Sequence, residues 1–362
     1  MSRDRLIIIG VVVLAALGYF VYKQADKDKK LGTTGPIAAS SADFPVISSP
    51  EDIDRLVIKD GKKDEIVLEK KDDKWVLTKP VSAPANQQSV KEIVTNLGTL
   101  KVKEQVVMTL DDEVKKAKKL DADQGVHVQA FKGAEKKTDI TAGTTGALGQ
   151  LITVAGKDGI VYASSGFSSY LYTKEPKDWR DKEVLKFDEA NVTGIAIENK
   201  IGDAGMATFS FTKGEKEWGA SYNGKPLARF DEQRAKDLLK EMHVVNAEDF
   251  GDGKPPSDTG ADAPDGTITI SFKDNAPKIV LKIGKPAANG TSRYAFKDGN
   301  PTIFVVGKPT ADWVLADLAK FQRPLDAGAP DGGSKDAGGG MPRPMELPPG
   351  MQMPPGMPPG HP

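Results

Sequence analysis

The residue types that most often carry catalysis or hold metals are scarce in this sequence. It has no cysteine and three histidines, His127, His243 and His361. Without cysteine, thiolate nucleophiles, disulfides and Cys-ligated zinc or iron–sulfur sites are excluded. The histidines fall in a strand-like segment, at a helix end and near the C-terminus, so their spacing indicates no His-centred triad or metal site.

Acidic residues offer only weak site patterns. Asp121, Asp123 and Gly125 resemble part of a calcium loop, but Gln124 and Phe131 stand where that motif needs an Asp or Asn and a bidentate Glu. We therefore interpret this segment as structural. Residues 250–266 form a Gly/Pro-rich acidic stretch, which we interpret as an inserted mobile loop rather than a cation site. Its four aspartates are Asp252, Asp258, Asp262 and Asp265.

The last residues, 326–362, are rich in Gly, Pro and Met and contain PPGM repeats. This composition cannot form a packed core and is typical of a disordered tail. Two other interpretations stay open: a polyproline II segment that a partner groove recognises, and a soft-ligand cluster suited to Cu(I). The candidate copper ligands are Met341, Met345, Met351, Met353, Met357 and His361.

Short alternating segments predict antiparallel strands in the first half of the chain. RLVIK at 55–59, EIVLEK at 65–70 and KWVLTK at 74–79 are separated by turn-forming residues, which predicts a three-stranded meander. Asn86 then precedes an amphipathic segment that predicts a helix covering the sheet. More strands are predicted from Val126 onward.

The second half repeats this order. Strand-like segments at 193–198, 207–213 and 217–222 are followed by Asp231, which precedes an amphipathic segment as Asn86 does. Lys-Asp-Gly recurs at 157–159 and 297–299, and each half closes with a tryptophan, Trp179 or Trp313, before a short helical segment. The pattern predicts a tandem duplication of a unit of about 140 residues. We expect Trp75 and Trp218 to be equivalent buried anchors beneath the two helices.

An unbroken apolar run extends from Leu6 to Tyr22 and is flanked by basic residues. As a helix it spans about 25 Å, close to a hydrocarbon core of about 30 Å. No small-residue cleavage site follows the run, so an uncleaved signal anchor is favoured over a secretory signal peptide. Lys plus Arg (50) nearly balances Asp plus Glu (51), which argues against a nucleic-acid partner.

The expected fold class is α+β: two tandem similar units, each an antiparallel β-meander or sheet with one covering amphipathic helix, after an N-terminal transmembrane helix. The expected segments are an anchor at 1–24, a flexible linker at 25–52, a first unit at 53–190, a second at 191–325 and a disordered tail at 326–362. The residues expected to be structural are Trp75, Pro80, Leu97, Trp218 and Leu239.

The segments KWVLTKPVSAPANQQSVKEIVTNLGTL, LDADQGVHVQAF and WRDKEVLKFDEANVTGIAIE, in this order after an anchor, resemble the bacterial family called domain of unknown function 4340. The resemblance covers residues 53–200 well and the second unit more loosely. The matching positions, which look structural, are Trp75, Pro80, Ala85, Leu97, Leu100, Arg180, Asp181 and Leu185. The family is associated with ABC-type export and gliding-motility systems, which implies an accessory role in the cell envelope.

The function expected from these observations is non-enzymatic: an envelope-tethered binding or assembly protein that serves an ABC-type exporter or gliding-motility system. It would be a single-pass protein of the bacterial inner membrane, held by Leu6 to Tyr22. The flanking charges alone slightly favour a cytoplasmic body, but a periplasmic body is expected because long domains translocate largely regardless of these charges. The main alternative is a cell-envelope hydrolase or carbohydrate-active enzyme whose carboxylates, such as Asp181 or Asp188, converge in the fold. The other alternative places the function in the methionine-rich tail. No cofactor is predicted.

Overall fold

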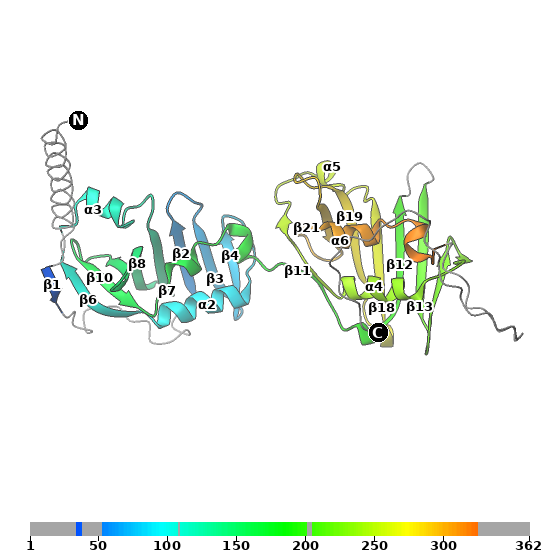
Figure 1. Cartoon of the computed structure of the whole chain (residues 1–362), viewed down its shortest axis with the longest axis horizontal. Helices are drawn as coiled ribbons and strands as arrows, with labels where there is room; N and C mark the ends of the chain where they lie inside the picture. Colours follow the sequence, from blue (N-terminus) through cyan, green and yellow to red (C-terminus); the bar gives the residue numbers. More distant parts are fainter. Residues whose placement is uncertain (1–33, 38–52, 108, 201–204, 325–362) are drawn as a thin grey trace, which may run out of the picture.

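The computed structural model describes residues 34–37, 53–107, 109–200 and 205–324, which form two large antiparallel sheets and a two-stranded ribbon between them (Figure 1). Four-residue to twelve-residue helices lie against the sheets. The α+β class with antiparallel sheets is therefore confirmed, and strands dominate it.

Within the described residues the first sheet has ten strands, in the order β1-β6-β10-β9-β8-β7-β2-β3-β4-β5. Their bounds are β1 Thr34–Ile37, β2 Arg55–Asp60, β3 Ile66–Lys71, β4 Lys74–Lys79, β5 Ala83–Pro84, β6 Lys101–Val107, β7 Val126–Lys132, β8 Glu135–Gly146, β9 Gly149–Val154 and β10 Val161–Ser165. The strands β2 to β4 are the predicted meander. Strand β6 was not predicted, because its lysine-rich sequence lacks a clear apolar alternation.

The helix α2 (Gln87–Gly98) covers one face of this sheet. Asn86 caps it by accepting a hydrogen bond from the Ser89 amide at 3.0 Å, as the sequence predicts. Its buried residues, Val90, Ile93, Val94 and Leu97, share a core with alternate residues of the strands. The opposite face, which we call the open face, carries α3 (Asp112–Ala117), and Figure 1 shows α2 and α3 on opposite sides of the sheet.

Within the described residues the second sheet has nine strands, in the order β15-β14-β13-β12-β18-β19-β20-β21-β17. Their bounds are β12 Val192–Lys200, β13 Met206–Lys213, β14 Trp218–Tyr222, β15 Lys225–Pro226, β17 Asp249–Phe250, β18 Gly266–Phe272, β19 Ile279–Pro286, β20 Arg293–Lys297 and β21 Ile303–Val306. This order repeats that of the first sheet from β5 to β6. The helix α4 (Glu232–Met242), capped by Asp231, packs on it as α2 packs on the first sheet.

The remaining elements connect these layers. The ribbon pairs β11 (Glu183–Lys186) with β16 (Val244–Asn246). The short helices are α5 (Pro256–Thr259), α6 (Lys308–Val314), and the 3-10 turns η3 Ser169–Tyr172, η4 Pro176–Trp179, η5 Glu189–Asn191, η7 Lys273–Asn275 and η8 Leu318–Phe321.

Backbone hydrogen bonds at the N-termini of α2 and α4 show which closing residues of the two units correspond. The Asn86 amide donates to the Trp179 carbonyl at 2.8 Å, and the Asp231 amide donates to the Phe321 carbonyl at 3.0 Å. The counterpart of Trp179 is therefore Phe321, and the predicted match with Trp313 was wrong. Trp313 shares only its residue type with Trp179. The equivalent buried position is filled by a different aromatic side chain, that of Phe321.

Two further expectations need correction. The acidic segment 250–266 is not an insertion, because it contains α5 between β17 and β18, where the first unit has α3 between β6 and β7. The tryptophans differ as well: Trp218 is buried, with 7% of its surface exposed, whereas Trp75 is only partly buried at the edge of its core. Both Lys-Asp-Gly turns lie between the last two long strands of their sheets.

In the described part of the chain, no helix has the length and apolar composition needed to cross a membrane. The predicted anchor Leu6 to Tyr22 and the methionine-rich tail lie outside that part of the chain.

Candidate functional site

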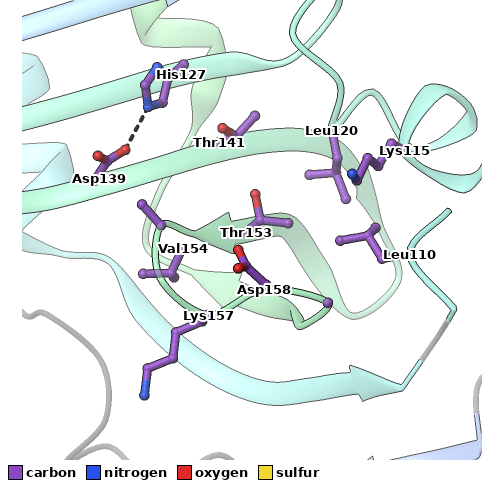
Figure 2. A pocket seen from close by; sticks show the side chains of 12 residues that line it. Leu110, Lys115, Leu120, His127, Asp139, Thr141, Thr153, Val154, Lys157 and Asp158 are labelled. Carbon is purple, nitrogen blue, oxygen red and sulfur yellow. Dashed lines mark hydrogen bonds and ion pairs between the residues drawn. The ribbon is translucent and has the colours of Figure 1, made fainter. Parts of the chain in front are cut away.

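A cavity of about 330 Å³ lies on the open face of the first sheet, beside α3; we call it the β8–β9 cleft. Figure 2 shows its lining from β7, β8, β9, the turn after β9, and the segment around α3. The lining residues are Leu110, Lys115, Leu120, His127, Asp139, Thr141, Thr153, Val154, Ala155, Lys157, Asp158 and Gly159.

Strand alternation places a row of polar side chains in this cleft. In β7, Val126 and Val128 are buried in the core, so His127 between them faces the opposite side. His127 pairs with Thr141 of β8, and Thr141 pairs with Thr153 of β9. Directly opposite residues in neighbouring strands share a face, so one imidazole and two hydroxyls form a line across three strands.

Hydrogen bonds to the Asp139 carboxylate hold the histidine end of this row. His127 Nε2 lies 2.7 Å from Asp139 Oδ1, while Gln129 Nε2 and Lys136 Nζ donate to Asp139 Oδ2 at 2.9 and 2.6 Å. Burial raises the pKa of the Asp139 carboxyl, but the hydrogen bonds from Lys136, His127 and Gln129 outweigh it, and the net result is a pKa below the ordinary value. Asp139 is therefore a carboxylate at neutral pH.

This arrangement is suited to binding. A nucleophilic triad needs a hydroxyl hydrogen-bonded to the histidine nitrogen that the carboxylate does not hold. Among the described residues, His127 has a hydrogen bond to Asp139 and none to a hydroxyl. The cleft instead offers hydroxyls, charges of both signs and an apolar wall of Leu110 and Leu120.

A second feature joins the two sheets, and we call it the Arg180 junction. Arg180 follows η4 in the first unit, is buried, and makes an ion pair through Nη1 with Asp252 of the second unit. Its guanidinium lies 3.5 Å from the centre of the Phe250 ring, a cation–π contact. Beside it, Lys177 Nζ lies 3.7 Å from Asp249 Oδ2. These contacts connect residues far apart in the sequence.

A shallow groove of about 390 Å³ runs along the junction, with Pro80 on its wall. Within the described residues Arg180 Nε is buried without a hydrogen-bond partner. An unsatisfied buried donor costs about 1–3 kcal/mol, so the cation–π stack and the ion pair must outweigh that cost for the junction to form.

The carboxylates considered for catalysis do not come together. Asp181 accepts a hydrogen bond from the Glu183 amide and Asp188 one from the Ala190 amide, so both stabilise local turns. In the acidic segment, Asp252 pairs with Arg180, whereas Asp265 pairs with Arg293 at 2.7 Å and Lys200 at 3.5 Å. No group of three or more metal-ligating side chains occurs in the part of the chain that the structure describes.

The residues predicted to be structural differ in how deeply they are buried. Leu97 and Leu239 are buried in the cores under α2 and α4, and Trp218 is buried with Leu239. Pro80 is exposed and follows a cis peptide bond at the junction groove, and Trp75 is half-buried.

Sequence analysis missed Asp139, Thr141 and Thr153, and it gave Arg180 no specific role. The alternation of His127 did predict that it points away from the core. Its carboxylate partner is twelve residues further on, across the β7–β8 turn, so only the strand register identifies it.

A family model described as Domain of unknown function (DUF4340) matches residues 75–264, just over half of the 362 residues. The match includes the β8–β9 cleft, Arg180, Phe250 and Asp252. No curated protein matches the chain. No solved structure matches it either.

Proposed function

This chain belongs to the DUF4340 family, and from that premise we propose that it is a non-enzymatic binding or assembly subunit of the cell envelope. In this proposal Leu6 to Tyr22 anchors it in the bacterial inner membrane, with the folded body on the periplasmic side. Its partner is an ABC-type export or gliding-motility system.

The observation that carries the proposal is the Arg180 junction. Two units joined by a short segment move independently unless their interface holds them. Here a buried arginine of the first unit stacks on Phe250 and pairs with Asp252 of the second. A cation–π contact contributes about 1–2 kcal/mol when it is shielded from water, and together with the ion pair to Asp252 it favours the orientation in which both contacts form. The two sheets are then held together as one scaffold.

The repeated strand order supports a duplication of one unit. Equivalent hydrogen bonds join corresponding strands and helices. The Trp75 amide donates to Gln87 Oε1 at 2.8 Å, and the Trp218 backbone donates to the Glu232 carboxylate. Two related units in a fixed relation suit a partner with two related surfaces, because the second contact forms at a high effective concentration.

The test is crosslinking in intact membranes followed by purification of the tagged full-length chain. Wild-type protein is compared with R180Q and with R234Q, which removes an exposed arginine on α4 that makes only surface ion pairs. We expect transporter subunits with the wild type and R234Q, and a several-fold lower yield with R180Q.

Two results would contradict the proposal. One is a wild-type chain that recovers no more membrane protein than an unrelated anchored protein does. The other is a purified monomer that turns over a substrate, which would support the enzyme alternative.

A further inference from the structure

The β8–β9 cleft contains charges of opposite sign that are not paired with each other. Lys115 and Asp158 both line it, and among the described residues no ion pair joins them. Lys115 Nζ lies 3.8 Å from Oδ1 of the fully exposed Asp112, a weak surface ion pair. In Figure 2 the Asp158 carboxylate points toward Thr153, whereas Lys157 points away. A cation and an anion are therefore available to a ligand.

Apolar side chains line the cleft together with these two charged residues. Leu120 is buried and Leu110 partly buried in a small cluster on the open face, together with Val106, Val161 and Ala163. Both leucines line the cleft. Apolar surface next to a few oriented polar groups is the usual composition of a small-molecule site, and about 330 Å³ lies at the lower end of the range for such sites.

The fold itself does not require the polar lining of this cleft, because the second unit has larger side chains at the equivalent positions. The cross-strand pair Thr141 and Thr153 corresponds to Lys282 and Phe296 in β19 and β20. Lys282 makes an ion pair with Asp298 at 2.8 Å, and Phe296 packs against the apolar cluster of that face. The same scaffold thus folds with a lysine and a phenylalanine at these positions, so it does not require the two threonine hydroxyls.

We propose that the β8–β9 cleft binds a small zwitterion, an amino acid or a dipeptide with a free ammonium and a free carboxylate group. The ammonium group binds Asp158 beside the Thr153 hydroxyl, and the carboxylate binds Lys115. An apolar side chain of the ligand packs on Leu110 and Leu120. Hydrogen bonds between ionised groups are about twice as strong as neutral ones, so both ends of such a ligand are recognised by charge.

The experiment is isothermal titration calorimetry on the full-length chain in detergent, with the dipeptide alanyl-leucine as the probe. We expect saturable binding that D158N and K115Q each weaken at least about tenfold, since each removes one charge-assisted hydrogen bond. K116Q is the matched control, because Lys116 is exposed on the same helix and does not line the cleft. Melting curves verify that the variants fold.

The blocked peptide N-acetyl-alanyl-leucinamide, which has neither charge, is expected to bind at least tenfold more weakly. The proposal is overturned if alanyl-leucine shows no saturable binding at millimolar concentration, or if the blocked peptide binds equally well. It is also overturned if D158N and K115Q bind like the wild type, or if the neutral disaccharide maltose binds more tightly than the dipeptide.

Discussion

At the scale of single residues, the contacts of Asp139 explain why its side chain is a carboxylate at neutral pH. Its side chain is 14% exposed and receives hydrogen bonds from His127, Gln129 and Lys136. Because the folded pKa lies below the unfolded value, the carboxylate stabilises the native state above the unfolded pKa. That contribution is lost as the pH falls through the folded pKa.

D139N is therefore expected to lower the free energy of unfolding by about 1–2 kcal/mol at pH 7. As the pH falls through the folded pKa of Asp139, the difference from the wild type should shrink, because the wild-type carboxyl becomes protonated. Urea titrations from pH 2 to pH 7 measure this, with D73N at an almost fully exposed position as the control. A difference that stays constant over this pH range would contradict the ionised state.

The residues of the cleft illustrate what sequence can predict at this scale. Alternation along one strand predicts the direction in which His127 points, because that property depends on its immediate neighbours. The partnership with Asp139 depends on the register of two strands, and the Arg180–Asp252 pair joins positions 72 residues apart. Neither pairing produces a pattern in the neighbouring sequence, so neither can be predicted from local sequence.

The two covering helices are the elements that the sequence predicted best. Their N-caps, amphipathic spacing and preceding meanders are all local signals. Asn86 accepts from the Ser89 amide at 3.0 Å and Asp231 from the Gln233 amide at 3.1 Å, so the two caps do the same work in both units.

We expect N86A and D231A each to lower the free energy of unfolding by about 1 kcal/mol, since each leaves a helix-terminal amide without its acceptor. Chemical denaturation of the two single variants and the double variant measures it. The caps lie in different units, so their effects should add. T95A, at an exposed position within α2, serves as the control. A negligible cost at either cap would argue against equivalent helices.

The two tryptophans should differ in the same assay. W218A removes a buried ring and should cost about 3–5 kcal/mol. W75A removes a half-buried ring and should cost about 1–2 kcal/mol, because part of its surface is already in water. Equal costs would show that Trp75 is as deeply packed as its counterpart, contrary to the structure.

At the scale of the whole molecule, two sheets meet at the Arg180 junction. The antiparallel α+β class could be anticipated from the alternating segments and the amphipathic segments, since these are local signals. The relation between the units could not, because it depends on Arg180, Phe250 and Asp252 meeting across the junction.

The anchor is tested separately from the junction. If Leu6 to Tyr22 spans the bilayer, alkaline carbonate should leave the full-length chain in the membrane fraction. A variant with two arginines in place of Val12 and Val13 should move to the soluble fraction, because charges at the centre of a bilayer are costly. A wild-type chain that carbonate extracts would exclude the anchor.

If the Arg180 junction makes the two units one rigid scaffold, the distance between spin labels on the two units shows it directly. The chain has no cysteine, so T95C on α2 and K240C on α4 would carry the only labels. Double electron–electron resonance should give one narrow distance distribution in the otherwise wild-type chain and in R234Q, and a broad one in R180Q. Two results would contradict a rigid scaffold held by Arg180: a broad distribution in the otherwise wild-type chain, or a distribution in R180Q that is as narrow as in the otherwise wild-type chain.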